Sequence, residues 1–126
     1  MKAIIFLVLA ACIISCGGNS GNDSTTTNTS TTKEEVKDPE AAKGLELITR
    51  SDCFTCHKLT EKNIGPAYAD VAKKYKTLND ATMDSIVTQI MKGGKGKWGN
   101  VPMMPHPAIT KEDAQLMAHY IMSIKP

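Results

Sequence analysis

The chain has 126 residues, of which 41% are hydrophobic and 22% are charged, so it has the length of one compact domain and is too short for a multidomain enzyme. Its 15 basic and 13 acidic residues give a formal charge of +2, which lacks the strong basic excess expected of a nucleic-acid-binding protein. Aromatic residues make up only 5% of the chain, so few large side chains are present to fill a core. A group other than side chains is therefore a candidate for filling it.

The amino terminus predicts export. The apolar run over residues 3–14 follows a lysine and is shorter than the roughly 20 residues that span a bilayer, so residues 1–15 are interpreted as a signal peptide. The run is followed by Ser15 and Cys16, after which the sequence turns polar; this pattern resembles the lipobox of bacterial lipoproteins, where the cysteine is lipidated. Cys12 fits that pattern less well, because cleavage before it would leave a very short apolar run. Ordinary secretion with two incidental cysteines is the remaining alternative.

Residues 16–38 are interpreted as the lipidated cysteine and a flexible linker. They consist almost wholly of Gly, Ser, Asn, Thr and charged residues, which cannot bury enough apolar surface to offset the entropy of ordering them. A flexible segment of this length has a root-mean-square reach of about 25 Å. We therefore expect a domain held close to the periplasmic side of a bacterial membrane by a lipid anchor.

Residues 39–126 are predicted to form an all-α domain of about four helices, since no stretch alternates with period two for long enough to indicate a buried strand. Cap residues and apolar spacing give the helix starts and ends. The first helix is expected from Pro39 to near Arg50, the second from Pro66, the third from Asn79 or Asp80 to the residue before Gly93, and the last from Lys111 to Ile124. The long loop over residues 92–109 is expected to hold part of a site.

Cys53, Cys56 and His57 form the C-x-x-C-H signature of covalent haem attachment, in which two thiols add to the haem vinyl groups and the histidine ligates iron. Two cysteines three positions apart reach neighbouring vinyl groups from one helical turn. A redox-active dithiol would normally lie beside a βαβ pattern, which is lacking. A zinc site would need two more ligands, and the chain offers only the scattered His106 and His119.

From Pro39 to the end, about 88 residues, the sequence resembles a small bacterial class I monohaem cytochrome c. The motifs that carry the resemblance are C-x-x-C-H, the Gly-Pro-Ala-Tyr segment at residues 65–68 and the Trp-Gly-x-x-Pro-Met segment at residues 98–103. The resemblance implies a cytochrome c-like fold around one haem c, with His57 and Met103 as axial ligands of the iron. It also implies that the Pro66 carbonyl accepts a hydrogen bond from His57 and that the Trp98 indole donates to a haem propionate.

Several residues depart from the family pattern. Met104 stands where proline is common, which places a second thioether beside Met103, and it is the alternative ligand. His106 stands where an asparagine often bonds the ligand sulfur, so it is either an exposed loop residue or a partner of the iron ligand, and Gln89 replaces an arginine that often meets a propionate. His119 is interpreted as a helix-surface residue. The other helical methionines are interpreted as packing residues; these are Met83, Met91, Met117 and Met122.

Two protein ligands leave iron no open position for substrate, so the expected function is one-electron transfer rather than catalysis. The expected partners are redox proteins of a respiratory chain or similar route, such as an oxidase, a reductase or a dehydrogenase, and a monomer is expected. The alternative is a haem enzyme or a gas or redox sensor with a displaceable methionine. Lys92, Lys95 and Lys97 are interpreted either as a solvated loop or as a basic rim that steers acidic partners.

Overall fold

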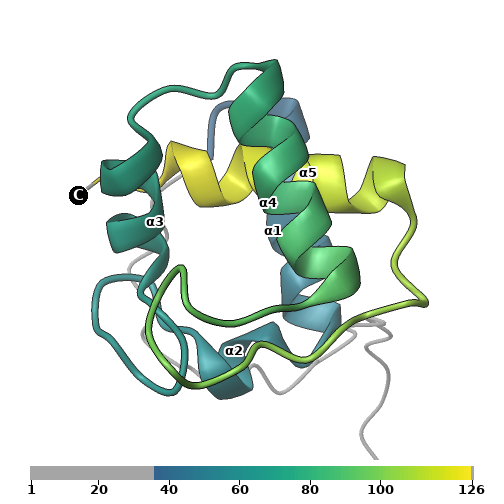
Figure 1. Cartoon of the computed structure of the whole chain (residues 1–126). Coiled ribbons are helices and arrows are strands. Elements are labelled where there is room, and N and C mark those ends of the chain that lie inside the picture. The colour runs from purple at the N-terminus through teal and green to yellow at the C-terminus, as the bar shows by residue number, and fades with distance from the viewer. Residues whose placement is uncertain (1–35, 126) are drawn as a thin grey trace, which may run out of the picture. The chain divides into compact units, whose positions relative to one another are not determined.

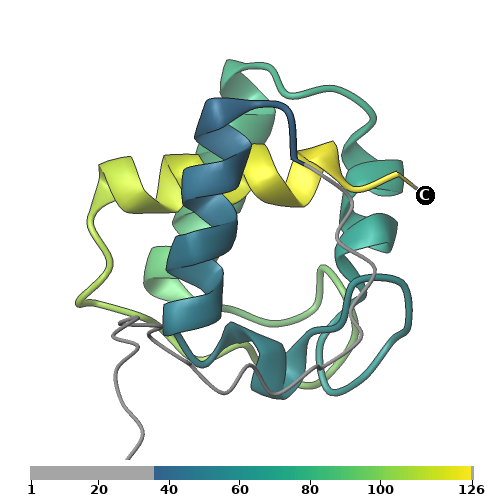
Figure 2. The same cartoon turned by 180° about the vertical axis from the view of Figure 1, so that it is seen from behind.

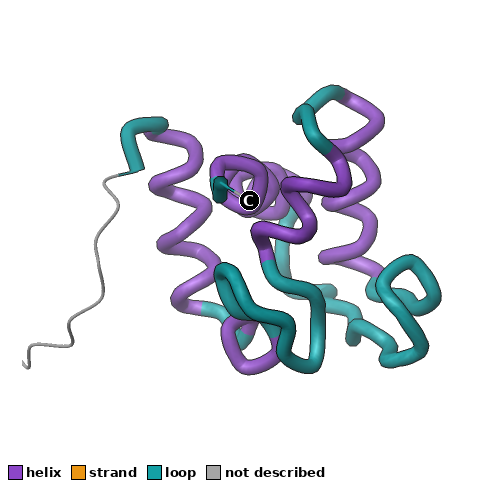
Figure 3. Tube along the Cα trace, turned by 90° about the vertical axis from the view of Figure 1, so that its left-hand side faces the viewer, coloured by secondary structure: helices purple, strands orange, loops and turns teal. Residues whose placement is uncertain are grey.

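The computed structural model describes residues 36–125, and the predicted signal peptide, Cys12 and Cys16 lie outside the described residues. Within residues 36–125 the structure contains five helices and no strand, in agreement with the all-α prediction. No helix in this part of the chain is long and apolar enough to cross a membrane. Figure 3 shows helices joined by loops through the whole described part.

Three helices begin at the residues that the sequence predicts, because a side chain satisfies a free amide at each start. Helix α1, Pro39–Arg50, is capped by Asp38, whose carboxylate accepts from the amide of Glu40 at 3.0 Å. Helix α4, Asp80–Lys92, is capped by Asn79, which accepts from the amide of Thr82 at 2.9 Å. Helix α5, Lys111–Ser123, is capped by Thr110, which accepts from the amide of Asp113 at 3.1 Å.

The start of the second predicted helix was wrong by two residues. Helix α3 spans Tyr68–Tyr75 and does not begin at Pro66, since the amides of Tyr68 and Ala69 donate across to the carbonyls of Lys58 and Leu59 at 3.0 and 2.9 Å. These two bonds hold the start of α3 against Lys58 and Leu59, which follow His57 in the chain. An additional short helix, α2, spans Cys53–Cys56 and was not among the four predicted.

Helices α1 and α5 cross in close contact, with α1 in front of α5 in Figure 2. Gly44 makes this possible, because a Cβ at this position would collide with the backbone carbonyl of Leu116. Helices α3 and α4 pack against α5 from the other side, as Figure 1 shows. The buried side chains of these four helices form one core: Ala41, Ile48, Tyr68, Val71, Ile86, Val87, Ile90, Ala114, Met117, Ala118, Tyr120 and Ile121.

The two long loops, residues 57–67 and residues 93–110, lie with α2 at the same end of the helical domain, below α4 and α5 in Figure 1. The fold therefore brings together the two segments that carry the sequence motifs. Residues of both loops line one cavity together with residues of α3, α4 and α5.

Candidate functional site

A cavity of about 200 Å³ lies between the helices and the two loops. Cys53 and Cys56 line it from α2, His57 lines it from the position directly after this helix, and Trp98 and Met103 line it from the loop between α4 and α5. Apolar residues of α3, α4 and α5 form the inner wall: Tyr68, Val71, Ile86, Ile90, Met117 and Ile121. The residues that the sequence assigned to one site are thus gathered around one apolar cavity.

The ring of His57 is fixed by three neighbours. Its Nδ1 lies 2.8 Å from the carbonyl oxygen of Pro66, and because a carbonyl only accepts, Nδ1 carries the proton and donates. This tautomer leaves the lone pair of Nε2 available for a metal. The ring also stacks on Tyr68 at 5.3 Å between centroids, and it lies so close to Gly65 that a Cβ there would be 2.8 Å from Nδ1.

The two cysteines are half-buried and are not joined by a disulfide. Burial raises the pKa of the Cys53 thiol, and the carboxylate of Asp52 raises this pKa further. A redox-active dithiol depends on a lowered thiol pKa, so the environment of Cys53 is the opposite of what that alternative needs. Among residues 36–125, no group of three or more His, Cys, Asp and Glu side chains is arranged to hold a metal.

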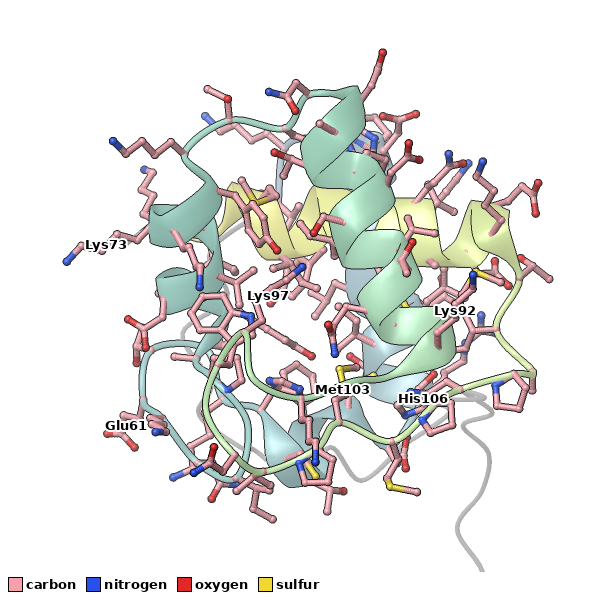
Figure 4. All side chains as sticks on the ribbon, viewed as in Figure 1. Glu61, Lys73, Lys92, Lys97, Met103 and His106 are labelled. Carbon is pink, nitrogen blue, oxygen red and sulfur yellow. The ribbon has the colours of Figure 1, made fainter. Side chains whose placement is uncertain are left out.

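The loop places the two adjacent methionines differently. Met103 is half-buried against the core and is paired with Gly94 through two backbone hydrogen bonds of 2.8 and 3.0 Å. Met104 is 69% exposed, although it also contributes to the edge of the cavity. Figure 4 shows Met103 at the centre of the site, below α4.

Trp98 is half-buried at the cavity and lies under a lysine. The ammonium of Lys74 is 4.3 Å from the centroid of the indole and donates to the carbonyl of Lys97 at 2.9 Å. The ammonium of Lys97 in turn donates to the hydroxyl of Ser85 at 2.7 Å. Sequence reasoning missed Lys74, because it is 24 positions from Trp98 and no motif joins the two.

The three lysines that were considered as a basic rim do not lie together. Lys95 and Lys97 line the cavity, whereas Lys92 belongs to the last turn of α4 and is not among the lining residues. In the view of Figure 4, Lys92 and His106 lie to the right of Met103 and Lys97 lies to its left. Positive charge at the mouth of the cavity therefore comes from two of the three lysines.

Other candidate residues take distinct positions. His106 is half-buried, and its ring nitrogens lie 3.2 Å from the carbonyl oxygen of Ile90 and 3.3 Å from Asp52. Gln89 lines the cavity from α4. His119 lies on α5 with Nε2 3.3 Å from the carboxylate of Glu40, far from the motif residues in the chain and absent from the cavity lining. The four helical methionines pack in or against the core.

The donor set and the apolar lining of the site fit a haem. An imidazole nitrogen left free by its tautomer and two half-buried thiols lie on one side of an apolar cavity, and a thioether faces it from the loop. Gly65 leaves room for the His57 ring that a larger residue would displace. Sequence reasoning listed Gly65 and Tyr68 only as parts of a motif, and their contacts with the ring are visible only in the fold.

Comparison with known proteins gives the same class. The family model "Cytochrome c" matches residues 41–125. Cytochrome c-552 of Hydrogenobacter thermophilus is 48% identical over 80 residues, which cover 64% of this chain and 80% of the relative. Cytochrome c-551 of Allochromatium vinosum is 37% identical over 86 residues, 68% of this chain and 90% of the relative. The crystal structure of Nitrosomonas europaea cytochrome c552 aligns with a TM-score of 0.60 at 33% identity, covering 64% of this chain and 99% of the other.

Fold and site together define a small all-α protein built around a covalently held haem. The chain belongs to the cytochrome c family, with relatives among the small c-551 and c-552 cytochromes. It carries haem c with its iron, covalently bound, and it is a haem c electron carrier.

Proposed function

We propose that the chain carries one electron at a time through a haem attached by thioether bonds to Cys53 and Cys56, with His57 and Met103 as the two axial ligands. The observation that carries the proposal is the arrangement of the C-x-x-C-H motif and Met103 around a single apolar cavity, with the Nδ1 proton of His57 committed to Pro66. Haem c supplies the reversible one-electron change of its iron. The chain holds the ligands in place through that change.

Each ligand has a support that the chain itself provides. The Pro66 carbonyl fixes the orientation of the His57 ring and increases the basicity of Nε2. The paired backbone of Gly94 and Met103 holds the thioether segment against the core. A thioether ligand and an apolar pocket both favour the reduced, less charged iron, so a comparatively high reduction potential is expected. The Trp98 indole N–H is assigned to a haem propionate.

The alternative of an enzyme or sensor with a displaceable methionine depended on Met104 and His106. Met104 is largely exposed, and the ring nitrogens of His106 face Ile90 and Asp52. These positions favour a site in which both axial positions are filled by protein, which disfavours substrate binding at the iron. We therefore assign electron transfer and no enzymatic reaction.

We further propose export and tethering. Residues 1–15 are assigned as a signal peptide, Cys16 as the lipidated residue and residues 16–38 as a linker, so that the domain, assigned to residues 39–126, works as a monomer at the periplasmic side of a bacterial membrane. The linker keeps the domain near membrane-bound redox partners, such as an oxidase, a reductase or a dehydrogenase. The variant Cys16→Ser is expected to release the electron carrier from the membrane fraction into solution. The variant Cys12→Ser is expected to remain associated with the membrane.

The ligand assignment is tested with two adjacent variants of the haem-loaded protein. Met103→Ala is expected to abolish the weak long-wavelength band of ferric haem with a thioether ligand and to lower the reduction potential. Met104→Ala is the matched control, because it removes an identical but exposed side chain, and it is expected to keep both properties. Loss of the band in Met104→Ala and its retention in Met103→Ala would reverse the assignment.

A further inference from the structure

The backbone amides that follow helix α4 bond partly to the helix and partly to the loop that carries Met103. The amide of Gly93 still donates to Gln89 in the helical pattern, at 3.0 Å, but the amide of Gly94 leaves that pattern and donates to the carbonyl of Met103 at 3.0 Å. Gly93 has φ +65°, and a Cβ there would collide with the Met103 carbonyl, so the loop lies directly on the helix end. The amide that would normally bond the Ile90 carbonyl is therefore used to hold Met103.

His106 supplies a donor to that carbonyl in place of Gly94. Its Nδ1 lies 3.2 Å from the oxygen of Ile90 and donates to it, since the carbonyl only accepts. The imidazole side chain is 22% exposed, and its Nε2 lies 3.3 Å from the carboxylate of Asp52, the residue before Cys53. One side chain thus connects the Met103 loop, the end of α4 and the segment that starts the haem-attachment motif.

The two contacts of the His106 ring are expected to differ in how much they stabilise the loop. Ile90 is buried, so its carbonyl would lose a partner in a place that water reaches poorly, which is a costly change. The Asp52 side chain is 77% exposed, and a contact with an exposed carboxylate contributes little. The hydrogen bond to Ile90 is therefore the more important of the two contacts that His106 makes.

The chain between Met103 and His106 is short and stiff. Pro105 and Pro107 flank the histidine, and Pro102 precedes Met103, so three of the residues around the pair have a fixed φ. A stiff segment transmits a fixed position at residue 106 to residue 103. Figure 4 shows Met103 and His106 on the same loop below the end of α4.

We infer that His106 is a positioning residue for Met103: by donating to the Ile90 carbonyl it completes the end of α4, leaves the Gly94 amide to Met103 and keeps the thioether over the cavity. The inference rests on the proposed role of Met103 as axial ligand. It assigns His106 a function through the loop backbone and not through a bond to the ligand sulfur.

The experiment uses haem-loaded protein and a set of four variants. His106→Ala removes both contacts. His106→Asn retains a donor at the place of Nδ1, which faces Ile90, and His106→Gln instead places a donor at the position of Nε2, which faces Asp52. His119→Ala is the matched control, because His119 is also about one quarter exposed and makes a 3.3 Å contact with a carboxylate, but it lies at the crossing of α1 and α5.

Two measurements report on the loop. The first is the affinity of free imidazole for the ferric protein, where it replaces the thioether sulfur on the iron; the second is hydrogen exchange of the Gly94 and Met103 amides by NMR. His106→Ala is expected to increase imidazole affinity about tenfold, the change that a lost hydrogen bond of about 1.4 kcal/mol produces, and to speed exchange at both amides. His106→Asn is expected to behave nearly as the wild type, and His106→Gln nearly as His106→Ala.

The outcomes separate this inference from the proposed function. Equal effects of His106→Ala and His119→Ala on imidazole affinity would overturn the inference, since a general loss of stability would then explain both. Rescue by His106→Gln and not by His106→Asn would also overturn it, because the anchor would then be Asp52. If the wild-type protein itself lacks a thioether ligand in its ferric spectrum, the ligand assignment fails instead.

Discussion

The side chain of His57 is held by groups that differ in kind. The Pro66 carbonyl fixes its tautomer, Gly65 lies so close to the ring that no Cβ fits between them, and the ring of Tyr68 stacks on it with an angle of 17° between planes. Tyr68 also meets Tyr120 edge-on at 6.4 Å, which connects the ligand to α5. A histidine restrained in this way keeps its position through a change of charge on the iron, which lowers the reorganisation that electron transfer requires.

Burial of Tyr68 makes stability depend on pH in the alkaline range. The Tyr68 side chain is buried, and burial raises the pKa of its phenol. The unfolded chain ionises this phenol near its ordinary pKa of 10.0, whereas the folded chain keeps it protonated to higher pH. The protonated Tyr68 phenol therefore costs no stability below pH 10. As pH rises above 10, this group lowers the free energy of unfolding by up to about 1.4 kcal/mol per pH unit.

Urea denaturation of the haem-loaded protein at a series of pH values between neutral and strongly alkaline tests this prediction. Tyr68→Phe keeps the stacked ring and removes the phenol, so its stability is expected to fall less steeply above pH 10 than that of the wild type. Tyr75→Phe, on the same helix, removes a half-buried hydroxyl that lies 3.1 Å from Ser85 and serves as the control. A wild-type slope in Tyr68→Phe would contradict the assignment.

At the scale of helices, the contact of α1 with α5 depends on the absence of a side chain at residue 44. A Cβ in Gly44→Ala would collide with the Leu116 carbonyl oxygen and lie 3.0 Å from Cβ of Tyr120. Backbone atoms cannot rotate away, so the two helices must separate. Alanine gains roughly 1 kcal/mol in helix propensity over glycine, but the collision costs more than this gain. The net effect expected for the variant is a loss of about 1–3 kcal/mol in the free energy of unfolding.

The neighbouring position provides the comparison. Lys43 is exposed on the same helix, and Lys43→Ala is expected to change stability by no more than about 0.5 kcal/mol. Thermal unfolding of the two haem-loaded variants gives the answer. Unfolding of Gly44→Ala at or above the wild-type temperature would show that the crossing tolerates a side chain.

Helix boundaries were predictable where the cause was local. Asp38, Asn79 and Thr110 cap their own helices within three residues, and that signal is present in the sequence. The start of α3 was not predictable in this way, because the amide of Tyr68 is taken by the Lys58 carbonyl, ten residues earlier in the chain. Helix α2 has only four residues, too few for an apolar period.

The same distinction holds for the site. The motif at Cys53, Cys56 and His57 and the resemblance at Met103 pointed to four residues, and all four line the cavity. The partners of His106 could not be predicted, because Ile90 and Asp52 are 16 and 54 positions away and join it only through the end of α4 and the start of α2. The contact between Lys74 and Trp98 was hidden for the same reason.

At the scale of the whole domain, the described chain has a small core. Ile48 is the largest side chain that is fully buried, and several of the other core residues are alanines. The apolar residues of α3, α4 and α5 that line the cavity share it with only the short helix α2 and two loops. A flat apolar cofactor between these surfaces would bury them, and two thioether bonds would staple it in place.

We therefore expect the haem-free chain to be largely unfolded. The variant Cys53→Ala/Cys56→Ala, produced without haem attachment, is expected to show weak helical circular dichroism and no cooperative thermal transition, whereas the haem-loaded wild type melts cooperatively. Wild-type chain produced without haem attachment is the matched control for the loss of the two thiols, and it is expected to behave like the double variant. A cooperative transition in both haem-free forms would mean that the helices bury enough apolar surface by themselves, and the cavity would then be a preformed binding site and not a part of the core that the cofactor completes.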